Sequence, residues 1–121
     1  MGIISRTTIL ILLLASMTAH ADGNKLLEQC HSAELFIDSK NITNEFDVGS
    51  CIGLIMGVRN TMVLMEKQSS IKVCWPQNGI TNKQAIRIVL AYLRKNPEKL
   101  HVDETALVMV AYLDAYPCNK Q

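Results

Sequence analysis

Apolar residues along most of the chain recur at intervals of three and four, which is the spacing of a helix, and strand-like alternation is missing. The first such stretch, residues 24–38, places an apolar stripe on one face of a predicted helix; its members are Leu26, Leu27, Cys30, Ala33 and Ile37. A polar link, residues 39–44, separates it from a second predicted helix at residues 45–67. The pattern predicts an all-α fold that opens with two helices joined by a short link.

The second predicted helix carries three glycines on one face, at Gly49, Gly53 and Gly57. Each glycine inside a helix costs ~1 kcal/mol relative to alanine, so three in register suggest a groove where another helix packs closely. A membrane-spanning helix is not expected, because Arg59 and Asn60 end the apolar run too soon. The methionines on this helix are better explained by core packing than by copper binding.

A loop at residues 69–79 leads into a third predicted helix. It contains Trp75, which lies beside a cysteine and is expected to be a packing lid, with a ligand-stacking role as the alternative. Thr81 and Gln84 have the spacing of a capping box and start the helix, and Pro97 ends it.

Three basic side chains of the third helix, Lys83, Arg87 and Arg94, fall within a narrow arc opposite its apolar face. They form either a solvated face or a contact surface for an acidic partner. This row and the loop around Trp75 are therefore the candidate partner-binding residues.

The fourth predicted helix begins at Asp103 or Glu104, runs to Tyr116 and is stopped by Pro117. It is apolar on nearly all sides, and a helix that is apolar all round must be buried all round. A domain of four helices has difficulty surrounding one of them. Part of this helix is therefore expected to contact a second protein chain.

Residues 1–21 have the order of a secretory signal peptide. Arg6 is the only early charge, an apolar run covers residues 9–15, and small residues precede a cleavage point after Ala21. The run is shorter than the ~20 residues that a spanning helix needs. The mature part, residues 22–121, is thus predicted to be one all-helical domain outside the cytoplasm that is free of the membrane.

All four cysteines lie in the mature part, at Cys30, Cys51, Cys74 and Cys118. An even count in an exported chain implies two disulfides, and their spacing fits no common zinc motif. Four cysteines allow three pairings. The order of the helices favours Cys30 with Cys51 across the first hairpin and Cys74 with Cys118 across the second.

The charge balance of the mature part argues against nucleic-acid and anionic-lipid partners. Removing the signal peptide removes Arg6 and leaves equal numbers of basic and acidic side chains. The sequence also contains no G-x-S-x-G motif, no phosphate-binding glycine loop and no calcium loop. No catalytic residues, metal or cofactor are predicted, and a binding role is favoured over an enzyme.

Several landmarks occur in an order that resembles the resistance-associated and type VI amidase immunity (Rap/Tai) family, and the likeness covers most of the mature chain. Leu54 stands where an aromatic residue is common in the family. The landmarks are Cys30 in the first helix, the run Cys51-Ile52-Gly53-Leu54-Ile55-Met56-Gly57-Val58, then Cys74-Trp75-Pro76, Gly79-Ile80-Thr81, residues 88–93, residues 96–101, and Ala115-Tyr116-Pro117-Cys118.

The resemblance implies a small all-helical periplasmic protein with two disulfides. Such a protein binds a peptidoglycan amidase toxin, injected by sister cells through a type VI secretion system, and blocks its active cleft. The resemblance also implies a homodimer. Two alternatives are a periplasmic acid-stress chaperone and a helical protein that binds a small apolar ligand.

Overall fold

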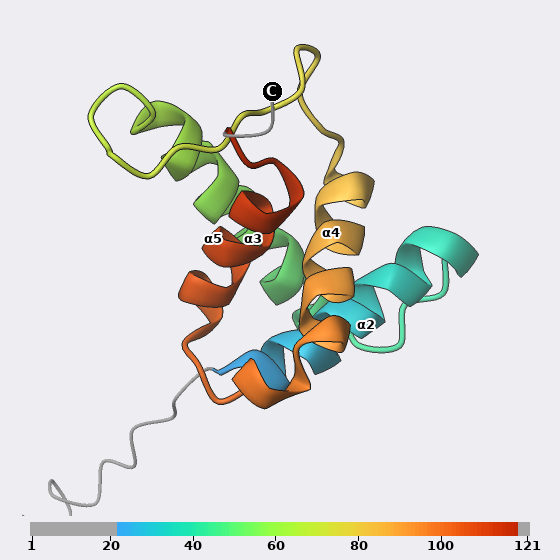
Figure 1. The fold of residues 1–121 in the computed structure, drawn as a ribbon. Coiled ribbons are helices and arrows are strands. Elements are labelled where there is room, and N and C mark those ends of the chain that lie inside the picture. Colours follow the sequence, from blue (N-terminus) through green and yellow to red (C-terminus); the bar gives the residue numbers. More distant parts are fainter. Residues whose placement is uncertain (1–21, 119–121) are drawn as a thin grey trace, which may run out of the picture.

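The computed structural model describes residues 22–118, and helices form most of this part (Figure 1). Four α-helices follow one another: α2 (Gly23–Ser39), α3 (Glu45–Leu64), α4 (Asn82–Lys95) and α5 (Glu104–Ala115). A short 3-10 helix, η1 (Pro97–Lys99), lies between α4 and α5. The all-α prediction is confirmed. The predicted signal peptide and its cleavage point after Ala21 lie outside the described residues.

Each α-helix begins at a side chain that accepts hydrogen bonds from the free backbone N–H groups of the first turn. Asp22 caps α2, Asn44 caps α3 and Asp103 caps α5. Thr81 and Gln84 form the predicted capping box of α4, in which each side chain bonds the other residue's backbone N–H. These local signals explain why the predicted and observed helix starts agree closely.

Helix α3 is shorter than predicted and ends at Leu64 instead of Lys67. The N–H groups of Gln68 and Ser69 both donate to the carbonyl of Met65 and close one further turn just beyond the helix. The residues after Met65 are polar and exposed, so they have no apolar side to bury against the core. Without such packing, continuing the helix would gain little free energy.

The core lies on one side of α3, where α2, α4 and α5 pack against it. The phenol of Tyr112 on α5 is fully buried and donates a hydrogen bond of 3.1 Å to the backbone carbonyl of Ile55 on α3. Burial raises the pKa of Tyr112 to about 12. The largest fully buried side chains are Tyr112, Leu26, Ile55, Ile86, Leu90, Leu93, Val89, Val108, Cys30 and Cys51.

Two disulfides tie the helices together, with the pairing that the helix order favours. Cys30 on α2 bonds Cys51 on α3, with Cα atoms 5.1 Å apart, inside the core. Cys74, in the loop before α4, bonds Cys118, just after α5, with Cα atoms 4.9 Å apart. The first bond fixes the α2–α3 pair, and the second closes the α4–α5 half of the molecule.

The glycine that permits a close approach in this fold is Gly23, at the start of α2. A Cβ atom there would collide with Leu107 and with the backbone of Leu100. The N–H of Gly23 donates to the carbonyl of Val102 at 3.1 Å. Gly23 therefore joins the start of α2 to the segment between η1 and α5.

Replacing Cys74 by serine should lower the free energy of unfolding by roughly 2–5 kcal/mol, because the Cys74–Cys118 bond closes a loop of 44 residues in the unfolded chain. Thermal and urea unfolding measure the loss. The double variant Cys74→Ser/Cys118→Ser is the control: it breaks the same bond without leaving a free thiol and should lose about as much. Unchanged unfolding in both variants would contradict the structural role of this bond.

Candidate functional site

An exposed turn, residues 76–79, lies between the second disulfide and α4. The N–H of Gly79 donates to the carbonyl of Pro76 at 2.8 Å and closes the turn. Gly79 has a φ of 68°, a left-handed conformation that glycine adopts without steric cost. In Figure 1 this yellow segment extends beyond the N-terminal end of α4.

The N-terminal side of the turn is held by covalent and backbone bonds. Cys74 forms its disulfide with Cys118, and its N–H donates to the carbonyl of Tyr116 at 2.9 Å. The preceding Val73 is buried and forms a bridge with Pro117. The chain entering the turn is thus attached to the chain leaving α5.

Trp75 anchors the same side of the turn by packing. Its ring meets that of Tyr112 edge-on, with ring centroids 5.0 Å apart, and lies 6.0 Å from the ring of Tyr116. The indole is half-buried and packs against the core. This geometry agrees with the predicted packing lid and leaves part of the indole accessible.

The C-terminal side of the turn is held by Arg59 of α3, whose guanidinium donates to the carbonyl of Ile80 at 3.2 Å. The capping box of α4 begins at the next residue, Thr81. The turn is therefore fixed at both ends while its four residues stay exposed. A loop held in this way loses little conformational entropy when it binds a partner.

The predicted basic row does not form a free positive surface, because α2 supplies carboxylates to all three side chains. Arg87 and Lys83 contact Asp38 at 2.8 and 3.5 Å. Arg94 donates from both terminal guanidinium nitrogens to the carboxylate of Glu34, at 2.7 and 3.4 Å. The alternative of a contact surface for an acidic partner is weakened, since two carboxylates of α2 offset most of the charge of the three basic side chains.

The ion pair between Arg94 and Glu34 is the best formed of this set. The hydrogen bond from Arg94 holds the pKa of Glu34 below its usual value. The same bond raises the pKa of Arg94. The row is therefore about half exposed to solvent and also attaches α4 to α2 through ion pairs, which the sequence did not predict.

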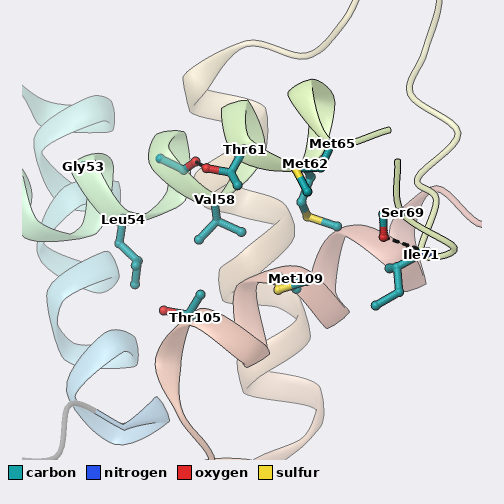
Figure 2. Close-up of a pocket in the computed structure, with 11 residues that line it drawn as sticks. Gly53, Leu54, Val58, Thr61, Met62, Met65, Ser69, Ile71, Thr105 and Met109 are labelled. Atoms are coloured by element: carbon teal, nitrogen blue, oxygen red, sulfur yellow. Dashed lines mark hydrogen bonds between the residues drawn. The ribbon is translucent and has the colours of Figure 1, made fainter. Parts of the chain in front are cut away.

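An apolar groove runs between α3, α5 and the loop after α3, on the glycine side of α3 where a groove was expected (Figure 2). It encloses about 520 Å³. Figure 2 shows side chains from α3 and from α5 facing each other across it, with Ile71 at one end. The groove is lined by Gly53, Leu54, Gly57, Val58, Thr61, Met62, Met65, Ser69, Ile71, Thr105 and Met109.

Within residues 22–118, no helix makes the close contact that was expected on the three glycines. Gly49, Gly53 and Gly57 are exposed, and a Cβ atom at any of them would meet no atom of the described chain within 4 Å. Their side of α3 is the one that α2, α4 and α5 leave uncovered. Gly53 and Gly57 do border a groove, but it is empty of any helix from residues 22–118.

The cysteines of the described residues have a structural role. All four cysteines are in disulfides. Within residues 22–118, no group of three or more histidine, cysteine or carboxylate side chains is placed to hold a metal ion. Among the same residues, no helix is both long and apolar enough to cross a membrane.

A family model for Rap1a immunity proteins matches residues 22–118. The chain belongs to the Rap1a immunity protein family. The match spans both disulfides, all four α-helices and the turn at residues 76–79, so the resemblance seen in the order of the cysteines and glycines is confirmed. No curated protein and no solved structure gives a significant match.

Membership of the Rap1a family implies that this protein gives immunity to a toxin and binds that toxin as its partner. The landmarks shared with the family are mainly scaffold residues: disulfide cysteines, the α4 cap and the α3 glycines. The turn at residues 76–79 is flanked by two of these landmarks. The scaffold of this Rap1a protein thus positions a short exposed segment.

Replacing Glu34 by glutamine should destabilise the protein by less than about 1 kcal/mol at neutral pH, because Arg94 is about half exposed. The pKa of Glu34 is lowered by folding, so its contribution is present above pH 4.5 and is lost as the pH falls below that value. Urea unfolding of the wild type and the variant between pH 7 and pH 3 measures this difference.

The matched control is Arg94→Gln, alone and combined with Glu34→Gln. If Glu34 and Arg94 stabilise the fold by contacting each other, the double variant should lose less free energy of unfolding than the two single variants lose in sum. A stability difference that persists unchanged at pH 3 would contradict the role given to the Glu34 carboxylate.

Proposed function

We propose that this protein is a periplasmic immunity protein that binds a type VI secretion peptidoglycan amidase toxin and blocks its active site. The observation that carries the proposal is the Rap1a family match over the whole described chain. The protein acts by binding, so no residue of it needs to be catalytic. The resemblance to amidase immunity proteins supplies the toxin class.

The periplasm is supported by two features. Both disulfides are built into the fold, and such bonds form and persist in oxidising compartments. The family match begins at Asp22, the residue after the predicted cleavage point, and Asp22 caps the first helix of the domain. Both features favour a signal peptide at residues 1–21 and a mature domain from residue 22.

The turn at residues 76–79 is the segment proposed to enter the toxin's cleft. Enzyme sites are concave, so a blocking element must be convex and must hold its shape before binding. Gln77 and Asn78 present carboxamides at this turn, and a carboxamide offers the same donor and acceptor groups as an amide bond. An amidase cleft is built to bind such groups. Trp75, at the base of the turn, is the second proposed contact.

The mature chain should inhibit its amidase when the two are mixed in equal amounts, which is measured as loss of peptidoglycan hydrolysis. The variant Gln77→Ala/Asn78→Ala should weaken binding about tenfold or more, since exposed turn residues contribute to the complex but not to the fold. The control Asn41→Ala/Gln68→Ala changes the same residue types at other exposed positions and should bind normally.

The outcomes separate the function from the site. A fully active amidase in an equimolar mixture with wild-type protein would contradict the immunity function. Normal inhibition by Gln77→Ala/Asn78→Ala, with unchanged thermal unfolding, would leave the function intact and contradict the role of the turn.

The mature protein recovered from the periplasm should begin at Asp22. Intact-mass measurement and N-terminal sequencing test this directly. A chain that keeps residues 1–21 would contradict the signal peptide.

One alternative gains support from the structure. The apolar groove of about 520 Å³ falls within the size range of small-molecule sites. Native mass spectrometry of the protein would show a retained molecule if the groove carries a small apolar ligand.

The resemblance also implies a homodimer, and we include a second copy of the chain in the proposal.

A further inference from the structure

Three of the four methionines within residues 22–118 line the apolar groove between α3 and α5 (Figure 2). Met62 lies in the last turn of α3, Met65 follows as the C-cap of that helix, and Met109 comes from α5. The fourth methionine, Met56, is not part of the lining. The groove therefore gathers thioether sulfurs from two separate elements of the fold.

Core packing, the expected role of the methionines on α3, does not account for this arrangement. Met65 is 44% exposed, so its side chain fills no space in the core. Met62 and Met109 pack against the edge of the core and also border the groove. The sequence could not show that Met109 lies across the groove from the methionines of α3, because that contact depends on how α5 packs.

The backbone places the methionines of α3 on one side of the helix. The N–H of Met65 donates to the carbonyl of Thr61 at 2.9 Å, so the helical geometry extends to this residue. Side chains three positions apart on a helix are neighbours, with Cβ atoms about 5–6 Å apart. A methionine side chain is unbranched and flexible, so the sulfur atoms of Met62 and Met65 can turn toward one point in the groove, which Met109 reaches from α5.

The other lining side chains suit neither hard cations nor zinc. The lining contains no carboxylate, imidazole or thiolate, and its side-chain oxygens are the hydroxyls of Thr61, Ser69 and Thr105. The hydroxyl of Thr61 donates to the carbonyl of Gly57, and that of Ser69 accepts from the N–H of Ile71. Calcium and magnesium need several oxygen ligands, and zinc needs thiolate, imidazole or carboxylate. Thioethers are soft ligands, and the ion that they select is Cu(I).

We propose that Met62, Met65 and Met109 bind one Cu(I) ion in the groove through their three thioether sulfurs. The donors are neutral, so binding transfers no electron and releases no proton. A single positive charge costs less to bring beside apolar side chains than the double charge of the common divalent metals. All four cysteines are in disulfides, so no thiolate of residues 22–118 competes for the ion.

An ion bound by these residues joins the C-terminal end of α3 to α5. Because the folded chain alone brings the three sulfurs together, Cu(I) binding should raise the Tm. The site uses no residue of the turn at residues 76–79. The copper site and the proposed inhibition of the amidase can therefore fail separately.

The first test observes the four methionine methyl groups of the mature chain by NMR, with the methyl carbons labelled. The probes are Ag(I), which resembles Cu(I) in its ligand preference, and Cu(I) kept reduced by ascorbate. One equivalent of either ion should shift the signals of Met62, Met65 and Met109 and should leave that of Met56 in place. Further ion should produce no further shift, and Zn(II) should shift none of the four.

The second test compares Met62→Leu/Met109→Leu with the matched control Met56→Leu. Leucine and methionine have similar volumes, so both variants should fold, and the Tm without metal checks this. The double variant loses two of three donors and should bind Cu(I) at least about tenfold more weakly in competition with a coloured Cu(I) chelator. Cu(I) should raise the Tm of the wild type and of Met56→Leu, and should leave that of the double variant unchanged.

The proposal is overturned if Ag(I) shifts none of the methyl signals, or shifts that of Met56 as much as the other three. It is also overturned if Met56→Leu loses as much Cu(I) affinity as the double variant, or if the folded double variant keeps the affinity of the wild type. Inhibition of the amidase by the copper-free protein would support the proposed function whichever result the groove gives.

Discussion

The packing of α3 against three other helices is the interaction on which the rest of the structure depends. Cys51 and Ile55 lie on its buried side, where the first is bonded to α2 and the second accepts a hydrogen bond from Tyr112 of α5. A domain with only four α-helices in its described part uses α2, α4 and α5 to cover this one side. The opposite side of α3 is left exposed, and the apolar groove that Gly53 and Gly57 border is a direct consequence.

The parts of the fold that the sequence predicted well are those set by local interactions. The capping side chains of Asp22, Thr81 and Asp103 determine where helices begin, and helical spacing identifies which residues face inward. The cysteine pairing followed from helix order alone, since the hairpins bring each pair together. Only the end of α3 was misplaced, at a point where tertiary packing stops and local propensity is weak.

The sequence was less informative about contacts between elements. It showed the basic row on α4 but not that Asp38 and Glu34 of α2 lie opposite it, so a paired surface could be taken for a binding one. It also showed apolar residues around both α3 and α5. The spacing of apolar residues along the chain did not determine that Tyr112 of α5 is buried in the core, nor that the glycine side of α3 is exposed. Which side of each helix is buried depends on which helix lies in the centre of the bundle.

The two exposed surfaces, the turn at residues 76–79 and the groove beside α3, differ in chemistry. The turn at residues 76–79 is polar and rigidly held, which suits a partner that is met after folding. The groove beside α3 is lined mainly by apolar side chains and by two glycines.

The turn depends on the Cys74–Cys118 bond, so its rigid form requires an oxidising compartment. On the proposed function, the inhibitor becomes ready to bind only after export, in the compartment where a peptidoglycan-cleaving toxin acts. The turn therefore keeps its rigid form only where the Cys74–Cys118 bond stays oxidised.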